Sequence, residues 1–334
     1  MPAFQRTQAF FWDKDVISGS TIDDFETPLF IAWQVSNRCK GRCLACCEES
    51  GPDKTWPDEL DRVEAIEVAR KLVDARIPYI AFGGGEPLLA PYIWEVFQIL
   101  SDGGCSLKIE TEGGEIDEAA LDRLASLRVD NVQISVDGAT PATHARMRPG
   151  APSFEEATGA LRALVARGIP AEMVFAPTRH NISEAVTLFD IACDIGCAAF
   201  VTGPLMRLGR AAQVWDSLAP DAADWNACAA ALKVRAAERA DSITRLSIYP
   251  WDIETEVQVR LEAPQAMMLV VPNGRVKLLN ALPFAPGDLR TQSLPEAWEA
   301  YRKAWRSPEV ADFISRCATD PGLLRHANEC WPVN

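Results

Sequence analysis

The sequence predicts an α/β protein, an open and partial (β/α)6 barrel followed by a small α+β extension. Strand-like and helix-like segments alternate between residues 29 and 203, which is typical of parallel βαβ units. Polar and glycine-rich motifs follow the ends of the strand-like runs, where ligands of such folds collect. After residue 210 the alternation stops. We therefore expect an N-terminal arm over residues 1–27, the barrel over 28–210 and the extension over 211–334.

Six short apolar runs are the predicted strands of the barrel. Because they are rich in apolar side chains and flanked by turn residues, we expect strands that are apolar on both faces, as in buried parallel sheets. They cover residues 30–35, 79–82, 106–111, 131–136, 171–176 and 198–202.

Helical patterns lie between these runs. Apolar residues from Leu60 to Val73 recur at helical spacing. The capping box Ser153-Phe-Glu-Glu156 predicts the start of one helix, and Asn181-Ile-Ser-Glu184 predicts the start of another. Each connection between strands therefore contains a helix, as parallel strands require.

The extension has a different pattern. Residues 213–240 are alanine-rich and helical. Residues 268–280 predict a β-hairpin that turns at Asn273-Gly274, a favoured pair in two-residue turns. A helix should then begin at Ser293-Leu-Pro-Glu296.

A cysteine triplet follows the first predicted strand. Cys39, Cys43 and Cys46 have C-x3-C-x2-C spacing. Three thiolates on one loop can hold three irons of a cubane cluster and leave the fourth open, whereas electron carriers fill all four corners with cysteine. A zinc site is the alternative, although zinc usually takes four closed ligands in paired units, and no second pair lies nearby. The triplet therefore favours iron–sulfur chemistry.

A glycine-rich turn, Gly83-Gly-Gly-Glu-Pro87, follows the second predicted strand. With the cysteine triplet, it resembles the radical S-adenosylmethionine (SAM) superfamily, in which these two motifs follow the first and second strands. Segments at Glu110 and Ile134 are similar to the superfamily's third and fourth strand ends. The resemblance covers about residues 28–210. It implies a TIM-like partial barrel, one [4Fe–4S] cluster and SAM as cofactors.

The resemblance also implies a division of roles. The three cysteines would bind the cluster, and SAM would chelate its open iron. Reductive cleavage of SAM would then give a hydrogen-abstracting 5'-deoxyadenosyl radical. Gly84 and Gly85 would let the backbone approach the SAM amine closely. The Glu86 carboxylate would accept a charge-assisted hydrogen bond from this amine. The remaining SAM contacts would come from Thr111, Ser135, Asp137 and Arg148. Plain turn and strand-cap roles are the alternatives for these residues.

The chain also departs from the superfamily pattern. Glu112 replaces the commonest residue of the third strand end, asparagine, and Ala45 replaces a usual aromatic residue. The extension resembles a SPASM or twitch domain but lacks its auxiliary-cluster cysteines. Only three cysteines remain beyond the barrel, and whether they bind a metal is open: Cys228, Cys317 and Cys330.

Composition limits the partners. The net charge of −14 argues against binding to nucleic acid or to an anionic membrane, and no signal peptide or apolar run long enough to span a membrane is present. Ten cysteines without a disulfide pattern favour a reducing compartment, so we expect a cytoplasmic protein. We interpret Cys193 and Cys197 as core residues and Cys47 as a bystander. The resemblance adds a flavodoxin- or ferredoxin-type electron donor.

The substrate is not identified by the sequence. Only 38 residues precede Cys39, too few for a leader-binding domain. We therefore expect a small polar metabolite, such as a nucleoside, sugar or cofactor precursor, with a ribosomal peptide delivered by a separate protein as the alternative. A non-catalytic iron–sulfur or zinc protein is the alternative from another class. Residues 248–252 and Cys330-Trp331 would either cover the barrel mouth or fill the core of the extension.

Overall fold

The computed structural model describes residues 21–333, so most of the predicted N-terminal arm lies outside the described residues. The described strands form one sheet with the order β10-β9-β8-β1-β2-β3-β4-β5-β6-β7. Neighbours from β8 through β7 run parallel, and β9 and β10 are antiparallel additions. The strands are β1 (Phe30–Ser36), β2 (Tyr79–Gly84), β3 (Ser106–Thr111), β4 (Val129–Ser135), β5 (Ala171–Phe175), β6 (Ala199–Thr202), β7 (Arg245–Ile248), β8 (Met267–Val270), β9 (Arg275–Lys277) and β10 (Gly287–Asp288).

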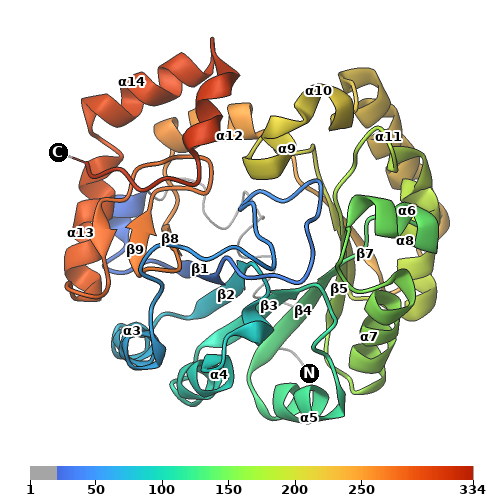
Figure 1. Ribbon diagram of the computed structural model, residues 1–334, viewed down its shortest axis with the longest axis horizontal. Coiled ribbons are helices and arrows are strands. Elements are labelled where there is room, and N and C mark those ends of the chain that lie inside the picture. The colour runs from blue at the N-terminus through green and yellow to red at the C-terminus, as the bar shows by residue number, and fades with distance from the viewer. Residues whose placement is uncertain (1–20, 334) are drawn as a thin grey trace.

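The predicted α/β class and open barrel are confirmed. Each of the six predicted strands is present, from β1 to β6, with ends that differ by at most a few residues. The sheet continues further than expected, because β7 pairs with β6 and β8 pairs with β1. The curved sheet and its outer helices form an incomplete ring (Figure 1).

The helices cover the outer side of the sheet (Figure 1). Those of the barrel are α3 (Arg62–Asp74), α4 (Ile93–Asp102), α5 (Glu118–Ser126), α6 (Pro141–Met147), α7 (Phe154–Ala166) and α8 (Ala185–Ile195). Those that follow β6 are α9 (Gly209–Gln213), α10 (Trp215–Leu218), α11 (Ala222–Glu238), α12 (Ile253–Glu262), α13 (Leu294–Ala304) and α14 (Pro308–Cys317). Short 3-10 helices are η1 (Ile22–Asp24), η2 (Pro87–Leu89), η3 (Ile182–Glu184) and η4 (Pro321–His326).

The two faces of the strands differ, so the expectation of strands that are apolar on both faces is wrong. On β1, Ile31 and Trp33 point into the core and are at most 2% exposed. On β3, Lys108 and Glu110 alternate with buried Ile109 and line an internal cavity. The barrel therefore has an apolar layer under the helices and a polar interior, which gives the strands an alternating pattern.

The helical segment expected to start at Asn181 is present as η3 followed by α8. Ser153 caps α7 through its side chain, but the Asn181 side chain makes no cap for η3. Its buried side chain instead accepts from the backbone and hydroxyl of Thr178 and donates to the carbonyl oxygens of Asp137 and Ala176. Asn181 therefore ties the ends of β4 and β5 together, which are long-range contacts that a local pattern does not reveal.

The extension is built onto the barrel sheet. The predicted hairpin is present as β8 and β9, but the Val271 amide bonds to the Arg275 carbonyl, so its loop has three residues instead of two. Gly274 ends this loop with a positive φ of 80°, which favours glycine. The predicted helix is α13, with Ser293 as its N-cap. Trp298 and Tyr301 of this helix stack at 5.1 Å and are buried. Among the described residues, no helix is both long and apolar enough to cross a membrane.

Candidate functional site

The cysteine loop lies directly after β1 and is held by backbone hydrogen bonds. Cys39 is buried, and Cys43 and Cys46 are half-buried. The amide of Cys39 donates to the Gly51 carbonyl at 3.1 Å. Two further amides of the loop donate to the carbonyl oxygens of Pro149, just after α6, and of Met147, its last residue, at 2.8 and 2.9 Å. The loop after β1, blue in Figure 1, crosses the middle of the ring of strands.

The three thiols share one electrostatic environment. Burial is the main cause that raises the pKa of Cys39, Cys43 and Cys46, and the Cys43 group further raises the pKa of the other two. A buried thiolate needs a compensating positive charge, which a bound metal centre supplies. All three thiols lie on the one loop that follows β1.

The described residues contain no group of three His, Cys, Asp or Glu side chains gathered tightly enough for a single metal ion. Thiolates that bind different irons of a cubane cluster do not have to converge on one point. Cys47 turns its thiol toward the Ala45 carbonyl, 3.9 Å away, as expected for a bystander. Cys193 and Cys197 are buried in the core, as predicted.

The glycine-rich turn packs against the start of the cysteine loop. The Gly85 amide donates to the Ser36 carbonyl at 2.7 Å, and the Glu86 amide donates to the Arg38 carbonyl at 2.8 Å. Gly84 has φ of +104°, and a Cβ at Gly85 would overlap the Arg38 carbonyl oxygen. These glycines are therefore required by the close approach of two chain segments, and their contact with SAM stays a prediction.

The Glu86 carboxylate is buried and surrounded by donors from the chain. Its Oε1 accepts from the Leu88 amide at 3.0 Å. Its Oε2 accepts from the Thr111 hydroxyl at 2.7 Å and from the Glu112 amide at 2.8 Å. Burial raises the pKa of Glu86 to about 7. Glu86 and Thr111 thus connect the ends of β2 and β3, and direct contact of either with SAM stays a prediction.

Glu112 is a site residue that the sequence did not identify as one. It is only 4% exposed, and its Oε2 accepts from the Cys39 thiol at 3.3 Å. Its buried Oε1 has no hydrogen-bond partner within the described part of the chain. A buried carboxylate oxygen without a donor is costly, so a cationic donor is expected to complete it. The replacement of the usual asparagine was the only signal in the sequence.

The unpaired Oε1 of Glu112 indicates whether the residues of this site fit the cofactors that the motifs imply. An ammonium group bound beside the cysteine loop would supply the missing donor, and the SAM amine is such a group. Three neighbouring thiols provide the soft ligands that iron–sulfur clusters use. The residues therefore fit both cofactors.

Of the other predicted SAM contacts, Asp137 lies just after β4 and Arg148 lies at the C-cap of α6. Arg148 and Asp137 form an ion pair at 2.9 Å, with Arg148 donating to Asp137 Oδ2. Asp137 Oδ1 also accepts from the Ala176 amide at 2.9 Å. Ser135 is half-buried at the end of β4. Their roles in binding SAM stay predictions.

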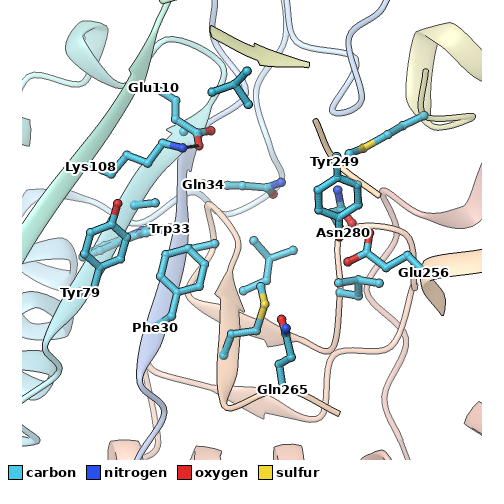
Figure 2. A pocket seen from close by; sticks show the side chains of 18 of the residues that line it. Phe30, Trp33, Gln34, Tyr79, Lys108, Glu110, Tyr249, Glu256, Gln265 and Asn280 are labelled. Atoms are coloured by element: carbon cyan, nitrogen blue, oxygen red, sulfur yellow. Dashed lines mark ion pairs between the residues drawn. The ribbon is translucent and has the colours of Figure 1, made fainter. Parts of the chain in front are cut away.

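A cavity of about 650 Å³ occupies the interior of the barrel next to this site. Figure 2 shows Lys108 and Glu110 on one wall, with Tyr249 and Glu256 on the opposite one. The Lys108 ammonium lies 3.4 Å from the Glu110 carboxylate. Gln34 donates to Glu48 at 3.1 Å, and burial raises the pKa of Glu48 to about 7.

The two candidate covering segments have different positions. Tyr249 lines the cavity and lies 6.2 Å from the Trp251 ring in an edge-on contact. Trp331 instead packs against Phe284 and Phe313 at 5.8 and 5.6 Å, within the extension. The segment around Tyr249 therefore forms a wall of the cavity, while Trp331 fills the core of the extension.

Comparisons with known proteins agree with the motifs. Residues 33–189 match the model of the Radical SAM superfamily. The mycofactocin maturase MftC of Mycobacterium ulcerans is 33% identical over 207 residues, which cover 60% of this chain and 55% of that protein. The AdoMet-dependent heme synthase of Methanosarcina barkeri is 24% identical over 327 residues, which cover 91% of this chain and 90% of that protein. The chain spans about half the length of the mycofactocin maturases it matches.

Solved structures share the fold. The structure of Streptococcus suis SuiB bound to S-adenosylmethionine has a TM-score of 0.68 at 13% identity, and covers 90% of this chain and 72% of that one. SuiB bound to the precursor peptide SuiA has a TM-score of 0.66 at 12% identity, and covers 82% of this chain and 65% of that one. At this identity the likeness concerns the fold alone.

Proposed function

We propose that this protein, a member of the radical SAM superfamily related to its SPASM and twitch members, cleaves SAM reductively. The resulting radical would abstract hydrogen from a substrate held in the barrel. The observation that carries the proposal is the contact between the two motifs. Backbone hydrogen bonds join the glycine-rich turn to the residues just before Cys39, so both motifs meet at the ends of β1 and β2.

The cofactors would supply the chemistry, since one electron delivered through the cluster to the SAM sulfonium gives methionine and a 5'-deoxyadenosyl radical. The chain's own residues would bind and orient them. Cys39, Cys43 and Cys46 would provide the thiolates, and the open oxygen of Glu112 would accept from the SAM amine. The ion pair of Asp137 with Arg148 would lie at the edge of the same site.

A small polar molecule is the substrate that we favour. The cavity volume of about 650 Å³ falls within the range of roughly 300–1,000 Å³ that is usual for small-molecule sites. Its wall carries charged and amide groups from β1, β3 and α12, such as Gln34, Glu110 and Glu256. These groups can pair with the hydroxyl and amine groups of a nucleoside, sugar or cofactor precursor. A site within the barrel would also shield a radical from stray hydrogen donors.

A peptide is the second candidate substrate. Two observations favour it: a fold neighbour, SuiB, has been crystallised with its precursor peptide, and several relatives are named mycofactocin maturases. The proposed flavodoxin- or ferredoxin-type donor would serve either substrate, because both reactions begin with the same electron transfer.

The test is SAM cleavage by the reconstituted protein. After anaerobic incubation with iron and sulfide, dithionite and SAM should yield 5'-deoxyadenosine and methionine, measured by mass spectrometry. The variant Cys43→Ala is the control and should yield neither. A wild-type protein that binds zinc or a cluster but never cleaves SAM would favour the non-catalytic alternative.

A further inference from the structure

The backbone of the cysteine loop is held by residues that lie far away in the sequence. Two distant residues donate hydrogen bonds to four of its carbonyl groups, those of Cys43, Cys46, Cys47 and Ser50. One is Arg210, just after the last predicted strand of the barrel. The other is Asn328, in the C-terminal tail after η4. Neither residue belongs to the motifs at the strand ends.

Arg210 makes three of these contacts. Its guanidinium group donates to the carbonyl oxygens of Cys43 and Ser50, both at 2.6 Å, and its amide donates to the Cys46 carbonyl at 2.9 Å. The planar fork of arginine has the shape to span two acceptors in this way, whereas a lysine ammonium does not. Arg210 thus fixes the loop on both sides of Cys46.

The preceding residue is part of the same contact. A Cβ at Gly209 would overlap the Cys47 carbonyl oxygen. Only glycine therefore allows α9 to approach the loop closely enough for the Arg210 contacts. On the other side, the Asn328 side chain donates to the same Cys47 carbonyl at 2.9 Å.

We propose that Arg210 and Asn328 are positioning residues that clamp the cluster loop, and that Arg210 also raises the reduction potential of the bound cluster. The proposal rests on the proposed function, because it requires a cluster at Cys39, Cys43 and Cys46. It gives the C-terminal tail a role at the cluster loop through Asn328 rather than through a cysteine.

The expected effect on the reduction potential depends on whether a carboxylate neutralises the charge of Arg148 or of Arg210. Arg148 is paired with the Asp137 carboxylate. In the described part of the chain, the side-chain hydrogen bonds of Arg210 end on neutral carbonyl groups. A reduced cluster carries one more negative charge than an oxidised one, so a nearby unpaired cation favours the reduced form.

The experiment compares four variants of the full, anaerobically reconstituted chain. Arg210→Gln removes the charge and part of the fork, Arg210→Lys keeps the charge, and Asn328→Ala removes the contact from the tail. Arg207→Gln is the matched control, because it makes the same charge change at a side chain that stacks on Trp215. Two quantities are measured: the rate at which a chelator removes iron, and the midpoint potential from a titration followed by electron paramagnetic resonance.

We expect Arg210→Gln to lose iron at least tenfold faster than the wild type and to have a more negative potential. Arg210→Lys should lose iron faster with a nearly unchanged potential, and Asn328→Ala should lose iron faster to a smaller degree. Equal values in Arg210→Gln and Arg207→Gln would overturn the proposal. If Arg210→Gln takes up no iron, unchanged iron loss in both Arg210→Lys and Asn328→Ala would overturn it. A wild type that takes up no iron would instead overturn the proposed function.

Discussion

Two buried carboxylates at neighbouring strand ends have very different surroundings. Glu86 accepts three hydrogen bonds from the chain. Glu112 accepts one, from the Cys39 thiol, and keeps a buried oxygen without a partner in the described residues. The motif pointed to Glu86 as the partner of the SAM amine, but free hydrogen-bonding capacity points to Glu112.

A pair of isosteric variants separates these roles. Glu112→Gln should weaken SAM binding to the cluster-loaded protein by roughly 10- to 100-fold, because a hydrogen bond to a charged group is worth about 1.5–3 kcal/mol. Glu86→Gln should mainly lower the thermal midpoint and have little effect on the affinity for SAM, since it disturbs the hydrogen bonds between the ends of β2 and β3. Titration calorimetry measures the affinity, and scanning calorimetry measures the thermal midpoint. Weaker binding in Glu86→Gln together with unchanged binding in Glu112→Gln would restore the direct role of Glu86.

The pH dependence of stability provides a second test at Glu86. Its pKa is about 7 in the folded protein, above the ordinary value of about 4.3 for an unfolded chain. The folded state therefore binds this proton more tightly. The stability it contributes is present below about pH 4.3 and is lost as the pH rises through about 7. As the pH is raised from about 5 to about 8, the thermal midpoint of the wild type should decrease relative to that of Glu86→Gln. A constant difference would show that the pKa is not raised.

At the scale of elements, the close approach of β2 to the cysteine loop depends on glycine. Gly85→Ala would push a Cβ against the Arg38 carbonyl, which should cost roughly 2–3 kcal/mol of folding free energy and reduce iron uptake. Gly159→Ala is the control, because no atom lies within 4 Å of its added Cβ in the middle of α7. This control should raise stability by up to about 1 kcal/mol. Equal denaturation midpoints for the two variants would contradict this account.

Local patterns predicted most of the barrel, and the failures have physical causes. The six strands were found because their apolar residues are continuous over short runs. The polar inner face was missed because Lys108 and Glu110 are separated by buried residues within a run that is apolar overall. Strand β7 was missed because Arg245–Ile248 is short and mixed in polarity. Its position depends on pairing with β6, which no local pattern reveals.

The site could be predicted only as far as its motifs reach. The three cysteines and the glycine-rich turn were found because their spacing is local. Glu112, Arg210 and Asn328 contact the cysteine loop from distant parts of the sequence, and their roles follow only from the folded chain. The same is true of the bond between Asn181 and the carbonyl of Asp137.

At the scale of the whole molecule, the extension and the barrel share one sheet. Strand β8 pairs with β1 along Phe30–Trp33, and β7 pairs with β6. A chain that ends after residue 244 would lose both partners and expose the apolar core behind β1. We expect it to lack a cooperative thermal transition and to bind no cluster. A truncated protein that melts cooperatively and holds iron would show that the barrel folds without the extension.

The central claim is that one cluster is bound by Cys39, Cys43 and Cys46. The most direct measurement is the iron and sulfide content per chain after anaerobic reconstitution, in the wild type and in Cys43→Ala. We predict about four irons and four sulfides for the wild type, as in a single [4Fe–4S] cluster, and none in the variant. About eight or more irons per chain, or a cluster that persists in Cys43→Ala, would contradict the claim.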